Sequence, residues 1–279
     1  DIEMSFETAD GLINLMEAMV KEIFETHGDQ QVSTPFLRLS HSDAIEHYGT
    51  DRPDLRFDMK LVTLTDIVKA SSFSVFIDEI QNQGIVKGLT VKGRASFSRK
   101  QIEDVTAFVQ QLGMKGLAWM KFQDGFLQSN IVKFFDDQTQ NNLIDALKVE
   151  EGDLILMAAG EKSRVNLSLD HLRRKLGDEL GLIDPKKNIF LWITDFPLFE
   201  WNPEENRLAA VHHPFTAPHS DDIPLLESDP INVRSNAYDL VLNGYEVGGG
   251  SNRIHSMEIQ KKIFSLLEIS EEDQKARFG

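Results

Sequence analysis

The stretch Tyr238–Ile254, "YDLVLNGYEVGGGSNRI", limits the possible folds of this chain more than any other. Two strand-like runs flank Asn243-Gly244, a dipeptide typical of a hairpin turn or a bend. The second run contains three consecutive glycines, and glycine inside a strand often marks a bulge or a ligand close to the backbone. We therefore expect sheet structure here, with an irregularity at the glycines.

The distribution of charge divides the 279 residues into three blocks. Residues 1–55 hold 3 basic and 12 acidic side chains, residues 56–185 hold 17 and 18, and residues 186–279 hold 9 and 15. The nearly neutral middle block between two acidic flanks predicts an inserted domain at 56–185. The flanks 1–55 and 186–279 are then the first and second parts of one domain.

Helix and strand patterns alternate along all three blocks, which predicts an α+β fold. Candidate N-caps are Thr8, Ser98, which has capping-box spacing to Gln101, and Ser256. The alternation in "DIEMSF" at the N-terminus predicts a strand. We interpret the basic run 173–175 as the solvated face of a helix.

Composition excludes several classes of protein. The chain has no cysteine, so disulfides and thiol chemistry are absent. No apolar stretch approaches the ~20 residues of a membrane helix, so no membrane partner is expected. The net charge of −16 argues against a general nucleic-acid-binding surface, although a nucleic acid held by another part of the protein stays possible.

Charged side chains surround the glycines. The stretch is neither a phosphate-binding loop nor a dinucleotide-binding fingerprint. Asp239 and Glu246 lie seven residues apart, so a regular strand would face them in opposite directions, whereas a bend could bring both to one site. Two carboxylates suit Mg²⁺, and Arg253 could grip a carboxylate. The alternative is a glycine-rich bulge with a surface ion pair.

Two histidines in "VHHPFT" form the second candidate site. Neighbouring residues on an extended segment face opposite ways, so one of His212 and His213 at most faces a given site. That geometry disfavours a metal pair. The histidine is either a hydrogen-bonding group on a pocket wall or a structural residue.

The segments "DIEMSF", "DFPLFEW", "VHHPFTAP" and "AYDLVLNGYEVGGGSNRIH" together resemble bacterial-type aspartyl-tRNA synthetases over essentially the whole chain. The middle block, most clearly "SRKQIEDVTAFVQQLGMKGLAWMKF", resembles the inserted domain of these enzymes, which tRNA-dependent amidotransferase subunits share. The resemblance implies that the flanking blocks belong to a class II catalytic domain, an antiparallel sheet flanked by helices.

The resemblance implies binding roles, and no catalytic residue, within this chain. Arg253 would bind the side-chain carboxylate of aspartate, His212 would line the same pocket, and Asp1 would hold the ammonium group. Glu246 would bind ATP and, with Asp239, Mg²⁺ on its phosphates. The glycines would form the pocket floor. Residue 252, an asparagine where the family usually has an aliphatic residue, should point away from the pocket.

The implied activity is that of an aspartate–tRNA ligase in the cytoplasm, with ATP, aspartate and tRNA as partners and a homodimeric parent protein. The anticodon-binding barrel and the three class II motifs are not found among these residues, so we expect the chain alone to be inactive. A non-catalytic interaction module and a synthetase paralogue with another substrate are the alternative hypotheses.

Overall fold

The computed structural model describes residues 1–28, 31–270, 272, 274 and 276, and it contains the hairpin at Asn243-Gly244. These two residues have φ values of 52° and 87°, as the tightest hairpin turns require. They join β10 (Ala237–Leu242) to the antiparallel β11 (Tyr245–Ser251). The sheet prediction is confirmed for this stretch.

Two more strands complete this sheet. β7 (Phe190–Thr194) is antiparallel to β10, and β1 (Leu37–Ser40) is parallel to β7, giving the order β1-β7-β10-β11. The expected antiparallel sheet thus has one parallel edge strand. Parallel neighbours need a long crossover connection, and here the connection contains a complete second unit.

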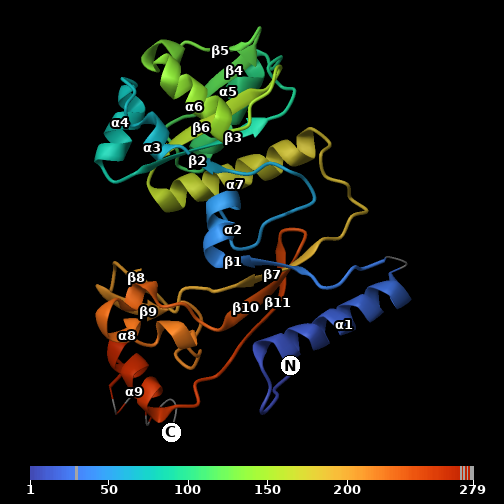
Figure 1. The fold of residues 1–279 in the computed structure, drawn as a ribbon, viewed down its shortest axis with the longest axis vertical. Coiled ribbons are helices and arrows are strands. Elements are labelled where there is room, and N and C mark those ends of the chain that lie inside the picture. The colour runs from blue at the N-terminus through green and yellow to red at the C-terminus, as the bar shows by residue number, and fades with distance from the viewer. Residues whose placement is uncertain (29–30, 271, 273, 275, 277–279) are drawn as a thin grey trace. The chain divides into compact units, whose positions relative to one another are not determined.

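The chain divides into unit 1, Asp1–Ser42 with Asn188–Gly279, and unit 2, Asp43–Lys187 (Figure 1). The charge pattern predicts an inserted block at 56–185, whereas in the structure unit 2 begins at Asp43. Residues 43–55 belong to unit 2 because buried cations hold their backbone. Lys87 Nζ donates to Ile45 O and Glu46 O at 3.3 and 2.8 Å, and Arg173 NH2 donates to Asp54 O at 3.0 Å.

Unit 2 is built on an antiparallel sheet of order β2-β3-β6-β4-β5. Apolar clusters cover both of its faces, so the central strand reads as the continuous run "LILMAAG". The strands are β2 (Val62–Thr63), β3 (Ile85–Val91), β4 (Ala118–Gln123), β5 (Phe126–Gln128) and β6 (Leu154–Gly160). The helices are α2 (His41–Tyr48), which begins in unit 1, α3 (Thr65–Val68), α4 (Ser74–Gln81), α5 (Arg99–Gln111), η1 (Val132–Phe134), α6 (Asp137–Ala146) and α7 (Lys162–Glu179).

The interpretation of the basic run 173–175 is wrong for its first residue. Arg173 is fully buried on the inner face of α7. Its guanidinium carbon lies 4.3 Å from the centroid of the Phe57 ring and 5.0 Å from that of Tyr48, and its Nε donates to Met59 O at 2.8 Å. This arginine fastens the segment 43–59 to α7.

In unit 1, α1 (Ala9–His27) covers one face of the sheet. Thr8 caps the helix as predicted, by accepting from Gly11 N at 3.1 Å. The buried Glu17 carboxylate accepts from Phe36 N and from Trp192 Nε1 at 3.1 and 3.0 Å. These hydrogen bonds dock α1 on one face of the sheet.

The rest of unit 1 packs around a second cluster. Its elements are the hairpin β8 (Phe199–Asn202) and β9 (Arg207–Ala210), η2 (Ser220–Asp222), α8 (Leu225–Ser228), η3 (Pro230–Asn232) and α9 (Met257–Leu266). Ser256 caps α9 as predicted. The strand predicted at residues 1–6 is wrong, because no described strand pairs with this exposed segment.

No helix in the described part of the chain is both long and apolar enough to span a membrane.

Candidate functional site

Asp239 and Glu246 face the same side of the hairpin, away from α1. Next to the turn, Glu246 pairs with Val241. Val247 then lies in a β-bulge without a partner, and beyond the bulge Asp239 pairs with Gly249. Val241 lies two residues from Asp239, so both carboxylates share a face. The two-residue turn alone places both carboxylates on this face, and the bulge brings Gly249 instead of Gly248 opposite Asp239.

Gly249 leaves room for these carboxylates. A Cβ atom at this position would lie 2.5 Å from Asp239 Oδ1 and 3.7 Å from Glu246 Oε1. Gly250 faces the other side, where a Cβ atom would lie 2.7 Å from the Tyr238 ring. The two glycines are therefore required for different reasons, the first by the site and the second by the core under α1.

The donor set fits a hard cation only in part. Carboxylate oxygens are the ligands that Mg²⁺ prefers, and Mg²⁺ usually completes its shell with water and phosphate oxygens. No cluster of three or more His, Cys, Asp or Glu side chains able to hold a metal occurs among the described residues. The pair Asp239 and Glu246 could thus hold Mg²⁺ together with a phosphorylated ligand.

The second element of the site is Arg253, which touches His213. Arg253 NH1 lies 3.4 Å from His213 Nδ1, and Ser251 Oγ lies 3.4 Å from His213 Nε2. The guanidinium carbon lies 5.9 Å from the centroid of the Phe215 ring. In the part of the chain that the structure describes, no carboxylate lies within ion-pair distance of this exposed arginine. A ligand carboxylate could fill that position.

Backbone hydrogen bonds hold the histidine loop against the arginine segment. Ala217 N donates to Asn252 O at 2.8 Å, and Ile254 N donates to Phe215 O at 2.9 Å. Thr216 and Arg253 form an isolated antiparallel bridge between these bonds. The loop that carries His213 is thereby fixed in register with Arg253.

The environment of His213 favours the neutral form of its ring. Burial of the ring and, next, the Arg253 guanidinium lower its pKa below the ordinary value of histidine. The backbone N–H of Phe215 points at Nδ1 from 3.3 Å, so Nδ1 is the acceptor and the proton is assigned to Nε2, toward Ser251.

The structure does not bring all the predicted site residues together in one site. Arg253 lies four residues after Gly249, about 13 Å along an extended strand, so a small ligand could span from it toward the carboxylates. His212 turns to the Phe196 ring, with centroids 4.8 Å apart, and His213 is the histidine beside Arg253. Asp1 lies in the exposed N-terminal segment. Alternation indicated only that at most one of the two histidines faces a given site, and the resemblance favoured His212 for the aspartate pocket.

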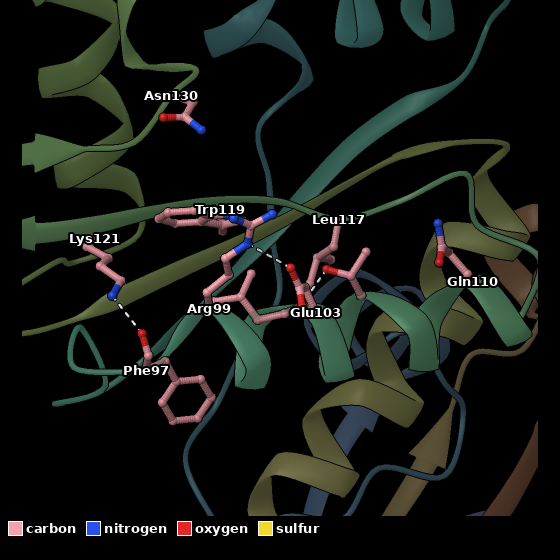
Figure 2. Close-up of a pocket in the computed structure, with 10 residues that line it drawn as sticks. Phe97, Arg99, Glu103, Gln110, Leu117, Trp119, Lys121 and Asn130 are labelled. Atoms are coloured by element: carbon pink, nitrogen blue, oxygen red, sulfur yellow. Dashed lines mark hydrogen bonds and ion pairs between the residues drawn. The ribbon is translucent and has the colours of Figure 1, made fainter.

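A separate groove of about 740 Å³ lies within unit 2 (Figure 2). Trp119 and Leu117 line it together with α5, where Arg99 pairs with Glu103 at 2.8 Å. Lys121 Nζ donates to Phe97 O at 2.7 Å. None of the predicted site residues lines this groove.

The comparisons with known proteins agree with the α+β fold and with the motifs. The family model for class II tRNA synthetases (D, K and N) matches residues 1–279, so the chain belongs to this family. The aspartate–tRNA(Asp/Asn) ligase of Protochlamydia amoebophila is 51% identical to this chain over 279 residues. These residues are 100% of this chain and 47% of the relative.

Two further relatives match in the same way. The aspartate–tRNA(Asp/Asn) ligase of Desulfatibacillum aliphaticivorans is 46% identical and the aspartate–tRNA ligase of Macrococcus caseolyticus is 47% identical, each over 100% of this chain and 47% of the relative. The chain therefore spans about half the length of the curated relatives it matches.

Proposed function

We propose that this chain is part of an aspartate–tRNA ligase that activates aspartate with ATP and transfers it to tRNA. The observation that carries the proposal is the hairpin face formed by Asp239, Glu246 and Gly249 and continued by Arg253. This face combines two carboxylates with an arginine for which the described residues supply no acidic partner. The names of the relatives supply the amino acid and the nucleic acid.

In the proposed reaction, an oxygen of the aspartate α-carboxylate attacks the α-phosphorus of ATP. A new P–O bond forms, the bond to the bridging oxygen breaks, and pyrophosphate leaves. A hydroxyl of the terminal adenosine of tRNA then attacks the aspartyl carbonyl and releases AMP. Glu246 and Asp239 would hold Mg²⁺ on the phosphates, and Mg²⁺ would offset the charge that develops on the leaving oxygen.

Arg253 would bind the side-chain carboxylate of aspartate through two parallel hydrogen bonds. Asparagine has a neutral amide there and would leave the guanidinium without a counter-charge, which costs several kcal/mol by order of magnitude. His212 and Asp1 are proposed for the same pocket on the basis of the resemblance alone.

Several features of the whole protein belong to the same proposal. The parent is expected to act in the cytoplasm as a homodimer, with tRNA bound mainly through regions outside this chain. Unit 2 is proposed to be an inserted domain that folds independently. Limited proteolysis should then release a stable fragment close to residues 43–187. If the protease degrades this segment at the same rate as unit 1, the segment is not an independently folded insertion.

The test of the function is ATP–pyrophosphate exchange by the full-length parent protein. Exchange should depend on aspartate and on Mg²⁺, and asparagine should support it at least 100-fold less well because of the unpaired guanidinium. Charging of aspartate tRNA and of asparagine tRNA is measured in the same preparation. Failure of aspartate to support exchange, with another amino acid or acid active instead, would favour a synthetase paralogue.

A further inference from the structure

We infer that His213 is a positioning residue that orients the Arg253 guanidinium toward a ligand carboxylate. The inference rests on the proposed function, because the carboxylate is that of the amino-acid substrate. It assigns a role to the second histidine of the pair, whereas the resemblance assigned one to the first.

Three groups converge on one ring nitrogen of His213. Phe215 N, Thr216 Oγ1 and Arg253 NH1 lie 3.3, 3.2 and 3.4 Å from Nδ1. A backbone N–H and a guanidinium can only donate, so Nδ1 must accept. The ring thus offers Arg253 an acceptor that carries no charge of its own and does not neutralise the guanidinium.

The ring is held in place from both sides. Thr216 is 1% exposed and its backbone N–H donates to His213 O at 3.1 Å, while Ser251 Oγ lies 3.4 Å from Nε2. These contacts tie His213 to the same segment that carries Arg253. An acceptor on a fixed loop restricts the rotamers of a long side chain, and this reduces the entropy that the side chain loses when it binds a ligand.

The remaining donors of Arg253 suit a carboxylate. The guanidinium carries five N–H donors in one plane, and the contact with His213 involves NH1. An edge with two parallel donors therefore remains for a carboxylate, and the Phe215 ring lies near the guanidinium. An acidic residue in place of His213 would compete with the ligand carboxylate for these donors. A neutral histidine does not compete for them.

The experiment uses the full-length parent protein and aspartate-dependent pyrophosphate exchange. His213→Leu removes the acceptor, whereas His213→Asn keeps one close to the position of Nδ1. His171→Leu is the matched control, because His171 is an exposed histidine on α7 in unit 2. The values of KM for aspartate, KM for ATP and kcat are measured separately for each variant.

His213→Leu should raise KM for aspartate about three- to tenfold, the size of one typical net hydrogen bond, and should change KM for ATP less than twofold. His213→Asn should recover most of the loss. In a protein that already carries Arg253→Lys, adding His213→Leu should raise KM for aspartate by a further factor of less than two. If the His213→Leu protein is unstable, His213→Gln is used in its place. The glutamine amide lies near the position of Nε2 and not of Nδ1, so this variant should also show the raised KM for aspartate.

Three results would overturn the inference: equal rises in KM for aspartate and ATP, an Asn variant as impaired as the Leu variant, or a Leu variant indistinguishable from His171→Leu. An active wild-type enzyme with any of these results leaves the proposed function intact. A wild-type enzyme without aspartate-dependent exchange would overturn both.

Discussion

Arg173 in unit 2 and Arg253 in unit 1 have similar contacts, but Arg173 is buried and Arg253 is exposed. Arg173 in unit 2 is fully buried between the Tyr48 and Phe57 rings and donates to backbone carbonyls. Arg253 in unit 1 is exposed, near the Phe215 ring and a neutral histidine.

The difference shows what separates a structural arginine from a candidate ligand-binding one. Aromatic rings and uncharged acceptors orient both guanidinium groups, and neither forms an ion pair among the described residues. For Arg173 the acceptors are carbonyls of the segment that it fastens, so its interactions stabilise unit 2. The Arg253 side chain is exposed, so a carboxylate ligand can approach it.

The largest expected effect is on the stability of unit 2. Arg173→Met should destabilise the chain by about 3–5 kcal/mol, because two buried carbonyls lose their donor and the segment 43–59 loses its anchor. Arg174→Met is the matched control, since the Arg174 side chain is 34% exposed and lies 4.0 Å from Asp170. It should cost less than about 1 kcal/mol.

Urea unfolding followed by circular dichroism measures both variants of this pair. Equal stability of Arg173→Met and Arg174→Met would contradict the structural role of Arg173 and would remove the contrast with Arg253.

A smaller effect is expected at the carboxylates of unit 1. Gly249→Ala places a Cβ atom 2.5 Å from Asp239 Oδ1 and must displace that carboxylate. We expect KM for ATP in pyrophosphate exchange by the parent to rise about tenfold, with a higher Mg²⁺ requirement. Gly248→Ala should have a smaller effect, because no atom lies within 4 Å of the added Cβ. Equal effects of the two changes would argue against a metal site at Asp239.

A third arginine gives the smallest effect. Arg234 forms a two-point ion pair with Asp222, at 2.8 and 3.0 Å, and these hydrogen bonds lower the pKa of Asp222 to about 2. A carboxylate whose folded pKa lies below its unfolded value stabilises the protein above about pH 4, and this contribution is lost as the pH falls toward 2.

Asp222→Asn should therefore cost about 1 kcal/mol at pH 7, a value reduced for the 45% exposure of the Arg234 side chain. The difference in unfolding free energy between wild type and variant should shrink as the pH falls from 4 to 2. A difference that does not change with pH would show that Asp222 contributes packing and not charge.

Local signals in the sequence predicted the local structure well. Thr8, Ser98 and Ser256 cap their helices as expected, and Asn243-Gly244 forms the expected turn. Each of these signals depends on neighbours within a few residues, so its outcome is decided before tertiary packing.

Tertiary partners decided the features that the sequence did not reveal. Arg173 is adjacent to two other basic residues, and only the distant carbonyls of Met59 and Asp54 distinguish it. The bulge at Val247 decides that Gly249, and not Gly248, lies beside Asp239. The loop register decides that His213, not His212, lies beside Arg253. The ligand-binding roles of the site residues stay predictions.

The central claim is that Arg253 binds the carboxylate of the amino acid and not the nucleotide. The most direct measurement is pyrophosphate exchange by the full-length parent and its Arg253→Lys variant, titrated separately with aspartate and ATP. Lysine keeps the charge but cannot form two parallel hydrogen bonds, so kcat/KM for aspartate should fall about ten- to several-hundredfold, with KM for ATP nearly unchanged. A loss confined to ATP, or no loss for either substrate, would contradict the claim.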